Sequence, residues 1–260
     1  MNLDEKVFLF DMDGTLTPPR KQIESFMITA LRKLSKFGKI GIVTGSDYDY
    51  VMQQMMAAFG TGGVPVDKID ILPCNGTKKY SSTPSRKFML ESEVNMIDEI
   101  GEESYKKIIK FCLESQAKII DQFPELSYTG TFLQYRGSLL NWCPIGRSAD
   151  HDQREMLVKV DHEKKFRDSY ANNLRKELEK EGIAVTVALG GSTSLDIYPN
   201  GWDKTYALKH YDRKEIYFVG DRCEEGGNDW HIYEKLKSTG RAYNVESTKD
   251  TEAIIERLIC

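Results

Sequence analysis

The 260-residue sequence has few cysteines that could cross-link a fold, and it has no long apolar run that could attach it to a membrane. It has only five cysteines, scattered and without a CxxC pair, so we expect reduced thiols and neither a disulfide framework nor a zinc site. No apolar run reaches the roughly 18 residues of a membrane span. Charged residues begin at Asp4, where a secretory signal would be apolar. These absences predict a cytoplasmic protein with no membrane partner.

An excess of positive charge is also missing. The chain has 36 Lys and Arg against 40 Asp and Glu, a formal net charge of −4. Binding to a nucleic-acid backbone relies on a basic surface, so we expect no nucleic-acid partner. Hydrophobic residues make up 40% of the chain, which at this length is enough for one large domain or two modest ones.

What is present begins with an alternation of strand and helix patterns. Apolar runs typical of buried strands alternate with segments whose apolar residues recur every three or four positions. In chain order these segments are strand 6–10, helix 23–38, strand 39–47, helix 48–60 and strand 68–76. This βαβαβ order predicts a parallel sheet with helices on its faces.

The pattern changes after a Ser- and Pro-containing link at 80–87 and resumes near Gly201. The intervening segments are a helix around 91–118, a hairpin at 131–145, a long charged helix at 151–181, and the strands IAVTVALGG and SLDIYP. After Gly201 come the helical WDKTYALKHY, strand 215–221 and a final helix. We therefore predict an α/β fold, in which a Rossmann-like parallel-sheet core (1–83 and 200–260) carries an inserted α+β cap domain (84–199).

Acidic and polar residues follow several of the core strands. Asp11 and Asp13 follow the first strand, residues 44–46 (Thr-Gly-Ser) lie at the end of the second, and Asp221 ends the strand near the C-terminus. In parallel α/β sheets, ligands bind at the carboxyl ends of the strands. Carboxylates that lie close together repel one another, and a divalent cation with hard oxygen ligands relieves this repulsion. Mg²⁺ is therefore the expected cofactor.

These residue types suit phosphoryl transfer. One carboxylate can attack phosphorus, and a second, two residues on, can protonate the leaving oxygen and deprotonate the next nucleophile. Lys204 and Mg²⁺ would neutralise the developing charge, while a hydroxyl holds a phosphate oxygen. Each feature alone is also typical of a solvated turn or a surface lysine, but together at strand ends they predict a catalytic site.

Several stretches also match a known family. DMDGTLT resembles the first motif of the haloacid dehalogenase superfamily. The chain as a whole resembles the eukaryotic-type phosphomannomutases through FDMDGTLTPPR, GIVTGSD, QYRGSLLNWCPIGRS, GGSTSLDIYPNGWDK and YFVGDRCEEGGND. The resemblance implies that Asp11 is the nucleophile and Asp13 the general acid/base. It also implies that Mg²⁺ is held by the side chains of Asp11 and Asp221 and by the backbone carbonyl of Asp13.

The resemblance extends to further site residues. Ser46 and Lys204 match the second and third superfamily motifs, although Thr44 competes with Ser46 for the hydroxyl role. The positions that match the family's sugar-phosphate-binding residues are Arg20, Arg136, Arg147, Arg154, Ser194 and Asp196. Two positions depart from the family pattern. Thr129 replaces an arginine, and Lys235 replaces an acidic ligand of a second, structural cation.

The implied activity is the interconversion of mannose 6-phosphate and mannose 1-phosphate through an aspartyl-phosphate enzyme, with a hexose 1,6-bisphosphate as activator. It would supply GDP-mannose synthesis, and the family suggests a homodimer formed through the cap. Three arginines in the inserted segment favour a mutase, which must hold two phosphates. The alternatives are a sugar-phosphate phosphatase of the same superfamily and a non-catalytic sugar-phosphate-binding module. Mannose and glucose phosphates differ in one hydroxyl, and both fit these motifs.

Overall fold

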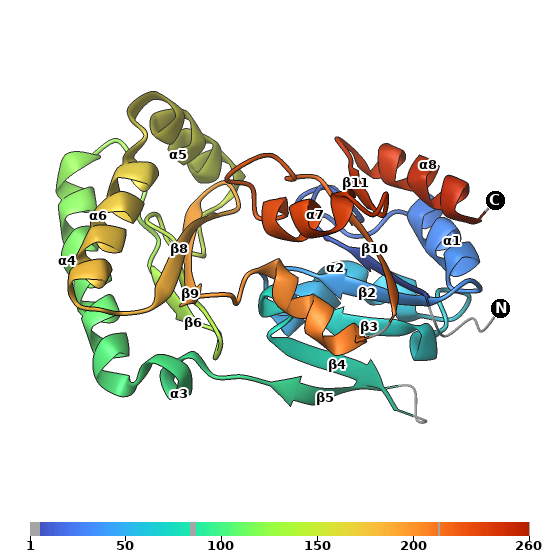
Figure 1. Cartoon of the computed structure of the whole chain (residues 1–260). Coiled ribbons are helices and arrows are strands. Elements are labelled where there is room, and N and C mark those ends of the chain that lie inside the picture. The colour runs from blue at the N-terminus through green and yellow to red at the C-terminus, as the bar shows by residue number, and fades with distance from the viewer. Residues whose placement is uncertain (1–5, 84–86, 213, 260) are drawn as a thin grey trace. The chain divides into compact units, whose positions relative to one another are not determined.

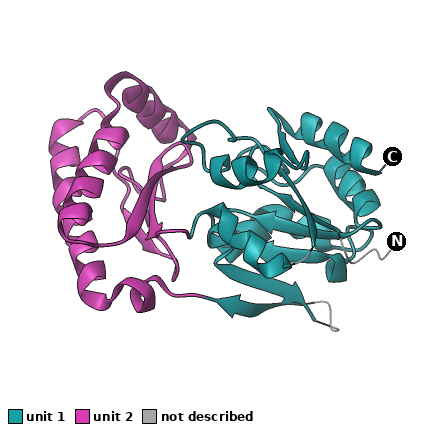
Figure 2. Cartoon of the chain, in the orientation of Figure 1, with its two compact units in different colours: residues 1–93, 202–260 teal, residues 94–201 magenta. Residues whose placement is uncertain are grey.

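The computed structural model describes residues 6–83, 87–212 and 214–259. They form two compact units, of which the first combines Met1–Glu93 with Trp202–Cys260 and the second is Val94–Gly201 (Figure 2). The sequence places the first boundary at 83/84, whereas the structure places it ten residues later. The cause is strand β5 (Phe88–Glu93), which pairs with β4 (Lys78–Ser82) in the sheet of the first unit.

The first unit is built on a seven-stranded sheet. Its strand order is β11 (Ala242–Asn244), β10 (Glu215–Gly220), β1 (Lys6–Phe10), β2 (Lys39–Val43), β3 (Ile69–Leu72), β4 and β5. The first five strands run parallel, while β4 and β5 are antiparallel additions at one edge. The predicted α/β class with a parallel-sheet core is confirmed.

Helices cover both faces of this sheet, which explains the continuously apolar sequence of β1. Phe8 and Phe10 face one side and Val7 and Leu9 the other, since successive strand residues point to opposite faces. The helices on the Phe8 side are α1 (Ser25–Leu34), α2 (Tyr48–Phe59) and α8 (Thr248–Ile259). On the Val7 side are the 3-10 helix Lys204–Tyr211 and helix α7 (Trp230–Lys237). Figure 1 shows these elements.

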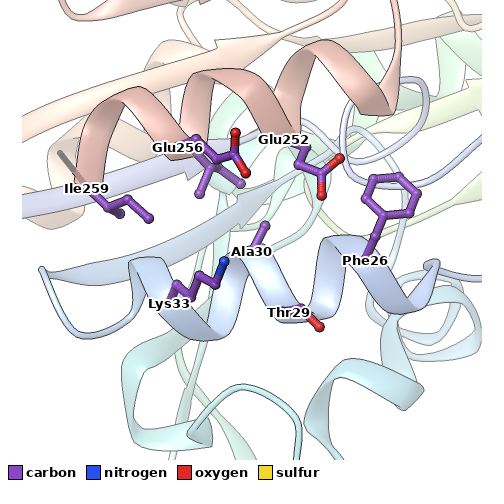
Figure 3. Close-up of a pocket in the computed structure, with 8 residues that line it drawn as sticks. Phe26, Thr29, Ala30, Lys33, Glu252, Glu256 and Ile259 are labelled. Carbon is purple, nitrogen blue, oxygen red and sulfur yellow. The ribbon is translucent and has the colours of Figure 1, made fainter.

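Helices α1 and α8 pack together but leave a small pocket between them (Figure 3). Its walls are the aromatic ring of Phe26, aliphatic side chains such as Ile259, and the charged ends of Lys33, Glu252 and Glu256. Among the described residues that line it, none is a site residue predicted from the sequence. The pocket is therefore a feature of helix packing and is separate from the candidate site.

The second unit is an α+β arrangement around a four-stranded antiparallel sheet. The strand order is β6 (Leu133–Tyr135), β7 (Leu140–Trp142), β9 (Ser194–Pro199) and β8 (Val185–Gly190). Its helices are α3 (Met96–Ile100), α4 (Glu102–Gln122), α5 (His151–Lys164) and α6 (Phe166–Lys180). The predicted hairpin at 131–145 is confirmed, because β6 pairs antiparallel with β7. Of the helices that the structure describes, none combines the length and apolar character needed to cross a membrane.

Several elements differ from the sequence-based expectations. The link predicted at 80–87 is in part strand β4, and its residues 84–86 lie outside the described part of the chain. The final helix predicted at the C-terminus is confirmed as α8, but the short strand β11, which joins the sheet edge beside β10, was not predicted. The 3-10 helix Lys204–Tyr211 stands where a regular helix was expected.

The long helix predicted at 151–181 is two helices, because the backbone turns at Lys165. Lys165 has a left-handed φ of 50° and separates α5 from α6. The Asp161 carboxylate accepts hydrogen bonds from the backbone N–H of Arg167 at 2.9 Å and from its Nε at 2.8 Å. Asp161 thus caps the first turn of α6 and pairs with a buried guanidinium, which stabilises the break.

We expect Asp161→Ala to destabilise the protein by about 3–5 kcal/mol, since it leaves the Arg167 charge buried and unpaired. Lys180→Ala in α6, the helix of Arg167, removes only an exposed pair with Glu177 and should change stability by less than about 0.5 kcal/mol. Chemical denaturation followed by circular dichroism measures both. Equal stability of the two variants would contradict the role given to Asp161.

Candidate active site

Two aspartates lie side by side at the carboxyl edge of the first unit's sheet. Asp11 directly follows β1 and Asp221 directly follows β10, and these strands are parallel neighbours. The ladder continues one residue beyond β1, where the Asp11 N–H donates to the carbonyl of Val219 at 2.9 Å. The strand pairing therefore brings together two carboxylates that are far apart in the sequence.

Lys204 lies at the centre of this acidic site. Its side chain is 1% exposed, and its Nζ donates to Oδ1 of Asp11 and, at 2.5 Å, to Oδ1 of Asp229. Lys204 is the first residue of the 3-10 helix, whose start is capped by Asp203 through a bond from the Thr205 N–H at 2.8 Å. The ammonium group is thus buried between two carboxylates, as a buried charge requires.

The 3-10 helix that carries Lys204 is tied to β3 and to the loop that follows it. At its far end, the Tyr211 hydroxyl donates to Oδ2 of buried Asp70 at 2.8 Å. Gly76 has a φ of 84°, and a Cβ there would lie 2.7 Å from Ala207, so only glycine permits this close approach. These contacts hold the helix, and with it Lys204, against the sheet.

Burial and neighbouring charges shift the proton affinities of the cluster. Burial raises the pKa of Asp11 well above its usual value, although the nearby Lys204 charge lowers it in part. For Lys204, burial alone lowers the pKa, but the carboxylates of Asp11 and Asp229 outweigh it and raise the pKa above the usual value. Lys204 therefore stays charged, and a further cation would relieve the remaining repulsion among the carboxylates.

The donor set fits a divalent cation with oxygen ligands. Asp11, Asp221 and Asp229 each offer a carboxylate oxygen, and these three atoms lie within 4.8 Å of one another. Oδ1 of Asp221 is buried without a hydrogen-bond partner among the described residues. Gly14, with a φ of 90°, leaves room for Asp221, since a Cβ there would lie 2.3 Å from Oδ2 of Asp221. Mg²⁺ or another hard cation suits such a set.

Asp229 was not predicted from the sequence, although it is as buried as any residue of the site. It is fully buried, and its Oδ2 accepts from the Arg222 N–H at 3.2 Å. A Cβ on Gly220 would lie 2.6 Å from Asp229 Oδ2, so this glycine also makes room for a carboxylate. An aspartate before a helix is typical of an N-cap, yet Asp229 makes no capping bond to α7. Its carboxylate is directed at Lys204 instead.

Thr44 and Ser46, the two candidates for the hydroxyl that holds a phosphate oxygen, differ in their surroundings. The Thr44 side chain is buried, and its Oγ1 accepts from the Ser46 backbone N–H at 3.1 Å. Ser46 is partly exposed in the turn between β2 and α2. Thr44 therefore shapes the turn, and Ser46 is the better placed of the two to contact a ligand.

Asp13 lies in the same loop but is not part of the carboxylate cluster. Its Oδ1 accepts from the backbone N–H of Arg20 at 2.9 Å and from the hydroxyl of Tyr50 at 3.1 Å. Arg20 adopts a left-handed φ of 61°, which presents its N–H to Asp13 while its side chain is exposed. The two aspartates of the first motif thus have different surroundings.

The remaining predicted residues lie in the second unit. Arg154 is buried, and its guanidinium donates to the carbonyls of Ala149 (2.8 Å) and Arg147 (2.9 Å) and to Oγ1 of Thr193 (2.9 Å). Arg154 thereby braces the loop that carries Arg147. Arg136 is also buried and donates to the side chain of Gln134 at 3.2 Å.

A polar pair crosses the sheet of this unit. Asn141 on β7 donates from Nδ2 to Oδ1 of Asp196 on β9 at 2.6 Å, and the two residues are direct cross-strand partners. Oδ1 of Asn141 is buried without a hydrogen-bond partner among the described residues. The nearby Ser194 hydroxyl donates to the carbonyl of Gly190 at 2.8 Å. Asn141 was not predicted from the sequence.

Solved structures with a similar fold are phosphatases. An IMP-nucleotidase of Plasmodium falciparum superposes with a TM-score of 0.65 at 14% identity, covering 99% of this chain and 69% of its own. A trehalose-6-phosphate phosphatase of Aspergillus fumigatus gives a TM-score of 0.56 at 15% identity, covering 98% and 92%. At such identities the likeness concerns the fold. The chain thus shares its α/β fold with these phosphatases.

Sequence relatives narrow this class to one family. The model of the eukaryotic phosphomannomutase family matches residues 27–260. The phosphomannomutase of Drosophila melanogaster is 33% identical over 98% of this chain and 96% of its own, and that of Saccharomyces cerevisiae is 34% identical over 98% and 94%. Phosphomannomutase 1 of Mus musculus is 34% identical over 94% and 88%. The chain belongs to the eukaryotic phosphomannomutase family.

We expect Mg²⁺ to raise the melting temperature of the wild-type protein, because a ligand that binds only the folded state stabilises it. Burial and the Asp229 charge raise the pKa of Asp221 to about 6. Asp221 is therefore ionised near pH 7.5 and gains protons as the pH falls through about 6, where protons compete with the cation. The Mg²⁺-induced rise should be smaller near pH 5.5 than near pH 7.5.

Asp221→Asn should abolish most of this response, as measured by differential scanning calorimetry with and without Mg²⁺. The control is Asp121→Ala, an exposed position near the end of α4, which should respond like wild type. A wild-type response in Asp221→Asn would count against the assigned cation site.

Proposed function

We propose that the protein interconverts mannose 6-phosphate and mannose 1-phosphate through a phosphorylated Asp11 and a hexose 1,6-bisphosphate. The observation that carries this proposal is the buried cluster in which Lys204 binds both Asp11 and Asp229, with Asp221 beside them. Family membership supports the same reaction.

In the first half-reaction, an oxygen of Asp11 attacks a phosphorus of the bisphosphate. The new P–O bond to Asp11 forms as the P–O bond to the sugar breaks, and Asp13 protonates the departing sugar oxygen. Lys204 stabilises the charge that develops beside Asp11, and Ser46 holds a phosphoryl oxygen. Mg²⁺, held by the side chains of Asp11 and Asp221 and the carbonyl of Asp13, would neutralise the phosphoryl charge. The buried Asp229 holds Lys204 in place.

The second half-reaction reverses these roles on the other monophosphate. Asp13 takes the proton of a sugar hydroxyl, the hydroxyl oxygen attacks the phosphorus on Asp11, and the bond to Asp11 breaks. The bisphosphate that results turns round, so that its other phosphate reaches Asp11 in the next cycle. Phosphate moves between sugar oxygens, and none is released to water.

The second unit would bind the part of the sugar phosphate that is not reacting. Arginines suit a phosphate because the guanidinium group makes paired, charge-assisted hydrogen bonds. We assign this role to Arg136 and Arg147, with Arg20 of the first unit and with Arg154 bracing the Arg147 loop. Ser194 and Asp196 would bind sugar hydroxyls, and Asp196 as an acceptor suits a hydroxyl better than a phosphate.

The wider setting follows from the reaction. Mannose 1-phosphate is the sugar 1-phosphate consumed in GDP-mannose synthesis, so we propose that the enzyme serves this pathway in the cytoplasm. We also propose that the protein assembles as a homodimer through the second unit.

Phosphorus NMR tests the reaction directly. Mannose 1-phosphate, Mg²⁺ and a trace of hexose 1,6-bisphosphate are mixed with the enzyme, and the signals are followed over time. The proposal expects mannose 6-phosphate to accumulate with little inorganic phosphate. Faster release of inorganic phosphate than formation of mannose 6-phosphate would identify a phosphatase instead.

We expect Asp11→Asn to lower turnover by several orders of magnitude. The amide keeps the size of the side chain but lacks the nucleophilic oxygen charge, and loss of a nucleophile is among the largest single effects on an enzyme rate. The phosphoenzyme should also disappear, which intact-protein mass spectrometry can check. Near wild-type turnover would remove Asp11 from the mechanism.

We expect Arg147→Ala to weaken binding of mannose 1-phosphate roughly ten- to a hundred-fold, because a charge-assisted hydrogen bond contributes about 1.5–3 kcal/mol. The matched control is Arg175→Ala in α6, where the guanidinium bonds the carbonyl of Val187. Isothermal titration calorimetry with the cation present measures both. Binding by Arg147→Ala that equals the control would refute its assignment to the phosphate.

A further inference from the structure

Tyr50 contacts the predicted acid/base residue from a different element. Tyr50 lies in the first turn of α2, where its own N–H donates to the N-cap Asp47 at 3.0 Å. From this position its hydroxyl donates to Oδ1 of Asp13 at 3.1 Å. The contact joins the loop after β1 to the start of α2, two segments separated by 37 residues.

The Tyr50 side chain is itself held in place. Gln54, one helical turn later, hydrogen-bonds the Tyr50 side chain and accepts from the Thr17 hydroxyl at 3.0 Å. Thr17 belongs to the same loop as Asp13, so this loop and the start of α2 are joined by hydrogen bonds at two points. Burial, followed by the nearby Asp13 charge, raises the pKa of Tyr50 above its usual value, and the phenol stays a donor.

These bonds distinguish the two oxygens of Asp13. Oδ1 accepts hydrogen bonds from both the Tyr50 hydroxyl and the Arg20 N–H, the latter at 2.9 Å. Two hydrogen bonds to the same oxygen hold the carboxyl group through Oδ1, so Oδ2 is the oxygen left to face a substrate. The carboxyl group is thus oriented by one oxygen and left to exchange protons through the other.

From this geometry we propose that Tyr50 is a positioning residue for proton transfer, holding Asp13 through Oδ1 so that Oδ2 exchanges a proton with the sugar oxygen. As the P–O bond to the sugar breaks, the proton on Oδ2 goes to that oxygen. In the return step, Oδ2 takes the proton of the attacking hydroxyl. The inference rests on the proposed function, in which Asp13 is the acid/base.

The fold of the loop does not depend on Tyr50. Its backbone closes on itself, since the Gly14 N–H donates to Thr17 at 2.7 Å and the Leu16 N–H to Met12 at 2.9 Å. Removing one hydroxyl from α2 leaves these bonds in place. A loss of rate in Tyr50→Phe would therefore reflect the orientation of Asp13.

The experiment compares leaving groups that do and do not need a proton. Tyr50→Phe should lower kcat for mannose 1-phosphate isomerisation about ten- to a hundred-fold with KM within about twofold, since positioned proton transfer contributes about 10²–10⁴-fold. Acetyl phosphate releases acetate without protonation, so its phosphorylation of Asp11 should keep the wild-type rate. The matched control is Tyr48→Phe, whose ring stacks on Tyr80 and which should behave as wild type with both donors.

Each result has one meaning. Wild-type isomerisation by Tyr50→Phe overturns the proposal, and so does an equal loss with mannose 1-phosphate and acetyl phosphate, which indicates a structural defect. If the wild-type enzyme does not isomerise mannose 1-phosphate, the proposed function fails by itself. In that case, the rates of phosphate release from mannose 1-phosphate and from acetyl phosphate are compared between wild type and Tyr50→Phe. A loss of rate confined to mannose 1-phosphate supports the role of Tyr50.

Discussion

The ion pairs of Lys204 hold the active site together. One ammonium group, almost completely buried, lies between the carboxylates of Asp11 and Asp229. Removing one member of such a pair typically costs about 3–5 kcal/mol, because the partner charge stays buried without compensation. The same arrangement leaves negative charge in excess, since Asp221 is a third carboxylate in the group. A divalent cation at this cluster, as proposed above, would balance the excess.

The chain topology explains how an inserted unit is compatible with this site. Asp11 and Lys204 are 193 residues apart, yet they meet because Lys204 comes directly after the chain re-enters the first unit. The contacts of Tyr211 with Asp70, and of Gly76 with Ala207, anchor the returning segment to β3 and its loop. Every residue of the acidic cluster therefore belongs to one compact unit, with its own sheet and core.

In the proposed mechanism, one oxygen of an acidic side chain is held by hydrogen bonds while another stays available to react or to bind a cation. Oδ1 of Asp11 is bound by Lys204, and Oδ1 of Asp13 is bound by Tyr50 and Arg20. Asp221 has a buried oxygen without a hydrogen-bond partner among the described residues, as suits a cation ligand. A carboxylate that is held through one oxygen is oriented while its other oxygen stays available to react. This lowers the reorganisation that catalysis requires.

The sequence by itself determined the alternation of apolar strands and amphipathic helices, the inserted α+β segment and the acidic residues after strands β1 and β10. Apolar periodicity and local motifs carry this information, because they express which face of an element is buried. Tertiary structure alone decided that β5 joins the core sheet, that Asp229 turns from the start of α7 to Lys204, and that Tyr50 reaches Asp13. An aspartate before a helix, or a tyrosine in its first turn, has the same local sequence whether it caps, packs or binds. Only the packing of distant segments selects among these, since the partners come from elsewhere in the chain.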